Sequence, residues 1–172
     1  MDEQASTKSY TQNMQGHQLI IYTDGSSRGN PGPGGYGVIL MWGDKKKELS
    51  AGYRLTTNNR MELLGVIVAL ESLTKKNIPL TIYTDSQYIV NSIEKKWLDG
   101  WIRNNFSGGK KNKDLWMRYH RLSKNFNIKF VWVKGHADNP YNNRCDILAT
   151  TAADGRNLLI DEGYEAQKNE LL

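Results

Sequence analysis

The sequence has little or nothing of three features: cysteine pairs, apolar runs long enough to span a membrane, and a secretory signal. It holds a single cysteine, Cys145, which excludes an internal disulfide and fits a reducing compartment. No apolar run approaches the roughly 20 residues that cross a bilayer. Residues 1–18 also lack the apolar core of a secretory signal. We therefore expect neither a membrane protein nor a secreted one, and the cytoplasm is the default location.

Length and charge describe an ordinary globular chain with a basic body. Its 172 residues suit one domain, and shares of 38% hydrophobic and 24% charged residues are typical of such domains. Both ends are acidic, so residues 19–153 carry +9 although the whole chain carries +5. A body this basic attracts phosphate backbones, but basic charge also occurs on surfaces that only confer solubility.

Hydrophobic periodicity predicts an α/β fold. Short runs rich in β-branched and apolar residues predict strands at 19–23, 35–42, 48–55, 80–84 and 128–133. Helical spacing of apolar residues predicts helices at 57–73, 86–96, 113–125 and 141–153. This order implies a five-stranded mixed sheet, with three antiparallel strands followed by two parallel ones and helices on both faces.

The same pattern divides the chain into a folded body with two tails. Residues 19–154 form the predicted domain. The polar residues 1–18 predict a disordered tail, and the acidic residues 155–172 predict a second, mobile tail.

Four acidic residues stand out in short segments of distinctive sequence. They are Asp24 in Y-T-D-G-S, Glu62 in N-N-R-M-E-L, Asp85 in Y-T-D-S and Asp146 in N-N-R-C-D-I-L-A. Each alone could be structural, as a turn residue, a helix cap or an acid near a helix N-terminus. Four acids brought together would repel one another unless hard divalent cations with oxygen ligands neutralised them. In a basic chain, such a metal cluster suggests a polyphosphate substrate and therefore a metal-dependent nuclease.

The segments that carry these acids, together with G-N-P-G-P-G-G-Y-G and V-K-G-H-A-D, closely resemble ribonuclease HI, the type 1 ribonuclease H family. The resemblance runs from about residue 20 to residue 153 and includes the basic protrusion of the free-standing bacterial enzymes. It implies hydrolysis of the RNA strand of an RNA–DNA hybrid with two Mg²⁺ ions, for which Mn²⁺ can substitute.

The resemblance assigns roles to the acids and to one histidine. Asp24, Glu62, Asp85 and Asp146 are the expected metal ligands, with Asp24 shared between the ions. In-line attack by water would leave a 5′-phosphate and a 3′-hydroxyl, with the ions stabilising both the attacking and the leaving oxygen. His136 is the expected auxiliary residue for proton transfer or product release, although it could be an exposed loop histidine without a role.

Contacts to the two strands of the hybrid also follow from the resemblance. Polar residues near the acids would read the RNA strand across the minor groove: Asn30, Asn58, Asn59 and Gln87. Helix capping and turn formation are alternative roles for the asparagines. Thr57 is expected to hold a DNA phosphate near the helix N-terminus.

The basic protrusion, residues 95–113, is the expected DNA site. It interleaves basic and aromatic residues that can follow a backbone and pack on sugars or bases: Lys95, Lys96, Trp97, Trp101 and Arg103. Two tryptophans four residues apart also match the apolar stripe of a helix, which leaves the role of Trp101 open. The protrusion is slightly shorter than in the best-known bacterial enzymes, so the exact lysines that touch DNA stay open.

The expected partner is the RNA–DNA hybrid alone, bound by a monomer that does not associate with membranes. Two other functions remain possible at this point. One is a DNA nuclease of the resolvase or transposase type on the same fold, and the other is a hybrid-binding protein without activity.

Overall fold

The computed structural model describes residues 18–135 and 138–170. The strands are β1 (Leu19–Ser27), β2 (Gly32–Trp42), β3 (Lys45–Thr56), β4 (Pro79–Thr84) and β5 (Asn127–Trp132). The helices are α2 (Asn58–Glu71), α3 (Gln87–Glu94), α4 (Trp97–Arg103), α5 (Lys113–Ser123), α6 (Pro140–Ala153) and α7 (Glu162–Glu170). Within these described ranges, no helix combines the length and apolarity needed to span a membrane.

The five strands form one mixed sheet in the order β3-β2-β1-β4-β5, as the sequence predicts. The first three strands are antiparallel neighbours, whereas β4 runs parallel to β1 and β5 parallel to β4. The strand order therefore reverses between β1 and β4. In open α/β sheets, ligands bind beyond the carboxyl ends of the strands at such a switch point.

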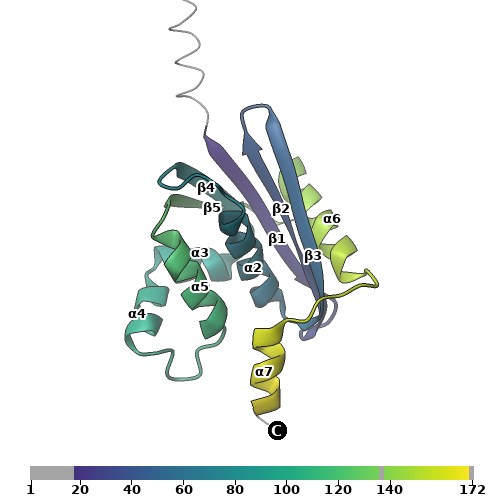
Figure 1. The fold of residues 1–172 in the computed structure, drawn as a ribbon, viewed down its shortest axis with the longest axis vertical. Coiled ribbons are helices and arrows are strands. Elements are labelled where there is room, and N and C mark those ends of the chain that lie inside the picture. Colours follow the sequence, from purple (N-terminus) through teal and green to yellow (C-terminus); the bar gives the residue numbers. More distant parts are fainter. Residues whose placement is uncertain (1–17, 136–137, 171–172) are drawn as a thin grey trace, which may run out of the picture.

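Helices cover both faces of the sheet, with α2 and α5 on one side and α6 on the other (Figure 1). Helix α2 is buried around most of its circumference, because it lies between the sheet and α5 in the main hydrophobic core. Helix α6 lies directly against the sheet. A Cβ atom at Gly37 would overlap the backbone oxygen of Cys145, so glycine is what permits this close approach.

Strand β1 is longer than the sequence pattern predicts. It continues through Asp24 to Ser27, and Asp24 pairs with Gly37 on β2. This end of β1 lacks a run of apolar side chains, yet its backbone pairing with β2 continues as far as Ser27, which lies opposite Gly34. Asp24 is therefore held within a strand rather than in a flexible turn.

The charge pattern predicts a mobile tail from residue 155, but the structure describes a packed segment there up to residue 170. Leu159 exchanges backbone hydrogen bonds with the edge of β3, accepting from the Arg54 nitrogen at 2.9 Å and donating to the Gly52 oxygen at 2.8 Å. Asp161 is buried, and α7 follows it. The prediction from net acidity is wrong here because Arg60, which is 101 positions away in the sequence, neutralises Asp161.

Candidate active site

Three of the four acids singled out by the sequence come together at the switch point of the sheet. Asp24 on β1, Glu62 on α2 and Asp85 directly after β4 each offer an oxygen within 4.8 Å of the others. We call these residues the carboxylate cluster. Asp24 is 4% exposed and Glu62 9% exposed, so two of the three carboxyl groups are largely removed from water.

Local backbone packing explains why these side chains meet. A Cβ atom at Gly25 would overlap the backbone nitrogen of Glu62, so α2 rests directly on β1 at the glycine that follows Asp24. The Gly25 nitrogen also donates to Asp24 Oδ1 at 2.9 Å. On the other side, Trp132 Nε1 donates to the backbone oxygen of Asp85 at 3.0 Å and links the ends of β4 and β5.

Burial and mutual repulsion shift the acidity of the carboxylate cluster. The pKa of Asp24 rises from its usual 3.8 to about 8, first because of burial and then because of the Asp85 charge. A hydrogen bond from Glu62 opposes this rise, and the charge of Asp146 adds to it. Burial, followed by the Asp24 and Asp85 charges, holds the pKa of Glu62 well above its usual value. The cluster therefore cannot be fully ionised at neutral pH without added positive charge.

The cluster also fits a divalent cation by its chemistry. Glu62 Oε2 is buried and has no hydrogen-bond partner among the described residues, although buried polar atoms normally have one. Carboxylate oxygens are the donors that Mg²⁺ and Mn²⁺ prefer. An ion here would both satisfy the unpaired oxygen and relieve the repulsion, so Asp24, Glu62 and Asp85 are suited to hold one.

The fourth acid, Asp146, lies in the second turn of α6 and is half-buried. It is close enough for its charge to raise the pKa of Asp24, but it is not part of the three-residue cluster. The predicted auxiliary histidine, His136, lies outside the described residues.

Three of the predicted substrate contacts accept hydrogen bonds around the N-terminus of α2: Asn30, Thr57 and Asn58. Asn30 Oδ1 accepts from the Asn58 nitrogen at 3.1 Å, and Asn58 Oδ1 accepts from the Ser27 nitrogen at 2.7 Å. Thr57 caps α2 by accepting from the Arg60 nitrogen at 3.2 Å. The acceptor oxygens of these three side chains therefore maintain the local structure. Asn59 and Gln87, the latter at the start of α3, are exposed.

The basic protrusion separates into exposed and packed aromatic residues. Trp97 is 45% exposed, and Lys95 Nζ lies 5.3 Å from its ring centroid. Trp101 instead packs edge to face against Trp116, with 6.0 Å between ring centroids. The structure thus gives Trp101 a core contact and leaves Trp97 accessible. The three basic residues predicted to contact DNA are also exposed: Lys95, Lys96 and Arg103.

A network around a buried arginine, close to Glu62 in the sequence, is not predicted by the sequence pattern. Arg60, two residues before Glu62, is only 1% exposed. Its guanidinium donates to Asp161 Oδ2 at 2.8 Å and to Asp114 Oδ2 at 2.7 Å, and it reaches Asn112 Oδ1 at 3.4 Å. One side chain therefore ties α2 to the start of α5 and to the segment before α7. A lone arginine within the apolar pattern of 57–73 was the available signal, but its partners lie far away in sequence.

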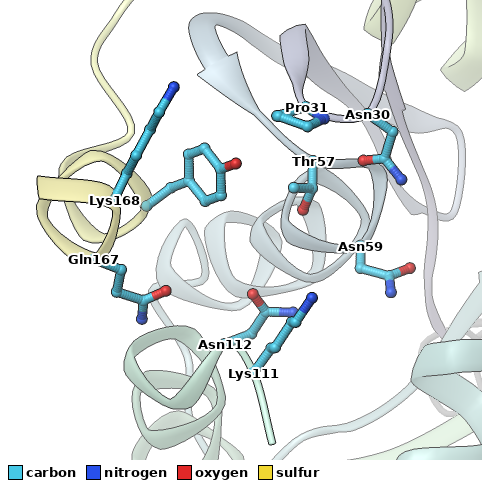
Figure 2. A pocket seen from close by; sticks show the side chains of 9 residues that line it. Asn30, Pro31, Thr57, Asn59, Lys111, Asn112, Gln167 and Lys168 are labelled. Carbon is cyan, nitrogen blue, oxygen red and sulfur yellow. The ribbon is translucent and has the colours of Figure 1, made fainter. Parts of the chain in front are cut away.

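A pocket of about 540 Å³ opens where these three elements meet (Figure 2). We call it the Thr57 pocket, and its lining residues are Asn30, Pro31, Thr57, Asn59, Lys111, Asn112, Tyr164, Gln167 and Lys168. Three of them belong to the predicted substrate contacts. The sequence pattern does not predict the residues from α7, because it predicts a mobile tail in that region.

Comparison with known proteins bears directly on this arrangement. The family model of RNase H matches residues 16–154, which is most of the chain. The chain belongs to the RNase H family. This matched region contains all four acids singled out above, whereas Asp161 and α7 lie beyond its end.

Similar RNase H proteins are known from several bacteria. Ribonuclease H of Syntrophus aciditrophicus is 52% identical over 151 residues, covering 86% of this chain and 87% of the relative. Ribonuclease H of Desulforamulus reducens is 53% identical over 154 residues, covering 87% of this chain and 96% of the relative.

Solved structures of RNase H proteins share the fold. LC9-RNase H1, a type 1 RNase H with the type 2 active-site motif, superposes with a TM-score of 0.74 at 30% identity, over 88% of this chain and 80% of that one. LC11-RNase H1 in complex with an RNA/DNA hybrid superposes with a TM-score of 0.62 at 27% identity, over 80% and 97%.

Proposed function

We propose that this chain is an endoribonuclease that hydrolyses the RNA strand of RNA–DNA hybrids and leaves 5′-phosphate and 3′-hydroxyl ends. Its family, its relatives named Ribonuclease H and a related structure bound to a hybrid support this activity. The observation that carries the proposal is the buried carboxylate cluster at the switch point of a basic domain.

The proposed ligands for divalent cations are Asp24, Glu62 and Asp85, with Asp146 completing a site for two Mg²⁺ ions that Mn²⁺ can also fill. When bound, such ions lower the pKa of a nucleophilic water and stabilise charge on the attacking and leaving oxygens. The raised pKa values of Asp24 and Glu62 and the unpaired Oε2 of Glu62 support this assignment.

The other proposed roles are to hold the carboxylates in place, to assist the reaction and to bind the RNA strand. The Gly25 and Trp132 hydrogen bonds hold the backbone beside Asp24 and at Asp85, so the carboxylates stay in place while the substrate binds. In the proposal, His136 assists proton transfer or product release. We further propose that Asn30, Asn58, Asn59 and Gln87 read the RNA strand through its 2′-hydroxyl groups.

The DNA strand would follow the Thr57 pocket and the basic protrusion. Exposed Trp97, Lys95, Lys96 and Arg103 remain the proposed contacts, because accessible aromatic and cationic groups suit a nucleic-acid backbone. Trp101 is half-buried and is better explained by its packing against the core. A monomeric state and a cytoplasmic location complete the proposal, and the single cysteine, which is buried and unpaired, is compatible with a reducing compartment.

A cleavage assay tests the proposal directly. The purified protein is incubated with a hybrid labelled in either strand, with Mg²⁺ or with excess chelator, beside Asp24→Asn. Asp44→Asn is the matched control, since Asp44 is exposed in the turn between β2 and β3. We expect Mg²⁺-dependent cutting of the RNA strand alone, lost only in Asp24→Asn. Cutting of the DNA strand would indicate another nuclease, and binding without cutting would indicate an inactive hybrid-binding protein.

A further inference from the structure

Helix α7 supplies one whole wall of the Thr57 pocket. Tyr164, Gln167 and Lys168 line the pocket together with Thr57 at the start of α2 and Lys111 before α5. Figure 2 shows Gln167 and Lys168 on the side of the pocket opposite Thr57. The pocket is therefore built partly by a helix that lies beyond the region matched by the family model.

The start of α7 is fixed by a buried charge. Asp161, 7% exposed, accepts hydrogen bonds from Arg60 and from Thr56 Oγ1, the latter at 2.7 Å. Its Oδ1 also accepts from the Tyr164 nitrogen at 3.3 Å and so caps the helix. Moving this buried carboxylate away would break its hydrogen bonds to Arg60, Thr56 and the Tyr164 nitrogen and remove one of the two acids that balance the buried Arg60 charge. The first turn of α7 is thus anchored to α2.

Helical spacing places Lys168 on the same face of α7 as the anchored residue Asp161. Asp161, Tyr164 and Lys168 are three and four residues apart, so they lie on one face of the helix. The face that Asp161 fixes toward α2 is the face that lines the pocket. A second ion pair, from Arg54 Nη2 to Glu165 Oε1 at 2.8 Å, holds the next turn against β3.

The chemistry of the pocket favours an anion. Among the described residues that line it, two are lysines, none is acidic, and most of the others offer amide or hydroxyl groups. The acids of the adjoining network are already paired, Asp161 and Asp114 with Arg60, and Glu165 with Arg54. The charge of Lys168 also acts on Glu165, but among the described residues neither Lys168 nor Lys111 forms a salt bridge, so both can direct their charge toward a ligand. A phosphodiester group matches this donor set.

We propose that α7 is part of the substrate-binding surface, with Lys168 contacting a backbone phosphate of the DNA strand in the Thr57 pocket. This rests on the proposed function, in which the RNA strand occupies the carboxylate cluster. Lys111 belongs to the basic protrusion, which is the proposed contact for the DNA strand. The DNA strand is therefore the expected source of the phosphate. Gln167 and Tyr164 complete the wall beside Lys168.

Steady-state kinetics on Lys168→Ala test this role. Lys76→Ala is the matched control, because Lys76 is an exposed lysine shortly before β4, at the opposite end of that strand from Asp85. We expect the KM of Lys168→Ala to rise about threefold to tenfold at low salt while kcat stays within about twofold. The slope of log KM against log salt concentration should fall by about one. Lys168→Arg should restore both values, and a slope equal to that of the control would overturn the proposal.

Neutral methylphosphonate linkages then locate the contact. They replace one phosphate at a time, first in the DNA strand and then in the RNA strand, and binding is measured by fluorescence anisotropy in chelator. At one position in the DNA strand, the substitution should lower the hybrid affinity of the wild type to that of Lys168→Ala. The same substitution should not lower the affinity of Lys168→Ala any further. If the ratio of the wild-type affinity to the Lys168→Ala affinity is the same at every substituted position, the contact is refuted. If the two affinities become equal only at a position in the RNA strand, the assignment to the DNA strand is refuted.

The two hypotheses fail in different ways in these experiments. Absence of RNA cleavage by the wild type would reject the proposed function, but the anisotropy measurement needs no cleavage and would still report on α7. Normal cleavage with an unchanged salt slope in Lys168→Ala would reject the role of α7 alone.

Discussion

Replacing Asp24 with asparagine should stabilise the metal-free protein while abolishing its activity. The pKa of Asp24 is raised to about 8, so the folded state holds a proton that the unfolded state releases near pH 4. Stability is therefore fully present below the unfolded pKa and is lost as pH rises toward 8. Asparagine has nearly the same shape, keeps an acceptor for Gly25 and carries no charge, so it avoids that loss.

The size of the effect follows from the shift. A change from 3.8 to about 8 corresponds to an upper limit of about 6 kcal/mol, at about 1.4 kcal/mol per pKa unit. Glu62 shares in the titration and the site can relax, so we expect a measured gain of about 2–4 kcal/mol at pH 9. At pH 5 the gain should be much smaller, because the loss of stability accumulates between the unfolded pKa of 3.8 and the folded pKa of about 8, and pH 5 lies near the lower end of that range.

Urea unfolding in chelator measures this difference. Wild type, Asp24→Asn and the exposed control Asp44→Asn are unfolded at pH 5, 7 and 9, with circular dichroism as the probe. Asp44→Asn should follow wild type at each pH. A gain for Asp24→Asn that is absent at pH 9, or equal at pH 5 and pH 9, would refute the electrostatic reasoning.

Four further predictions follow from the same structure. Saturating Mg²⁺ should raise the unfolding free energy of wild type, by about 2.7 kcal/mol when the ion is at 100 times its dissociation constant, and should do less for Asp24→Asn. Arg60→Met should cost about 3–5 kcal/mol in urea unfolding, because it leaves Asp161 buried and unpaired. Gly25→Ala should cost about 1–3 kcal/mol and lower kcat, since its methyl group pushes α2 away from β1. Trp101→Ala should destabilise the fold by about 2–4 kcal/mol, whereas Trp97→Ala should leave stability unchanged and raise KM.

Each of these predictions has a result that contradicts it. Equal Mg²⁺ stabilisation of Asp24→Asn would remove this carboxylate from the metal site. Arg54→Met is the control for the arginine network, because Arg54 forms an exposed ion pair, and an equal loss in both variants would deny the importance of burial. Wild-type kcat in Gly25→Ala would show that the α2 contact does not position Glu62. Equal stabilities of the two tryptophan variants would contradict the core role of Trp101.

Much of the fold was predictable because its signals are local. Alternating runs and helical spacing predict five strands and four of the helices, and the order of these elements implies the mixed sheet that the structure has. The prediction ended β1 too early, since the ladder opposite Gly34–Gly37 depends on backbone pairing and not on side-chain pattern. It also missed α7, because a short acidic segment has no apolar stripe to reveal it.

By itself, the sequence determined the fold class and the identity of the four acids, because short segments of distinctive residues carry both. The tertiary structure alone decided which acids lie together, how far the pKa of Asp24 rises, and that Trp101 packs against the core. It also decided that Arg60 and Asp161, 101 positions apart, form one buried pair and so bring α7 to the Thr57 pocket. Burial and charge pairing depend on partners that folding brings together, and no local pattern in the chain records those partners.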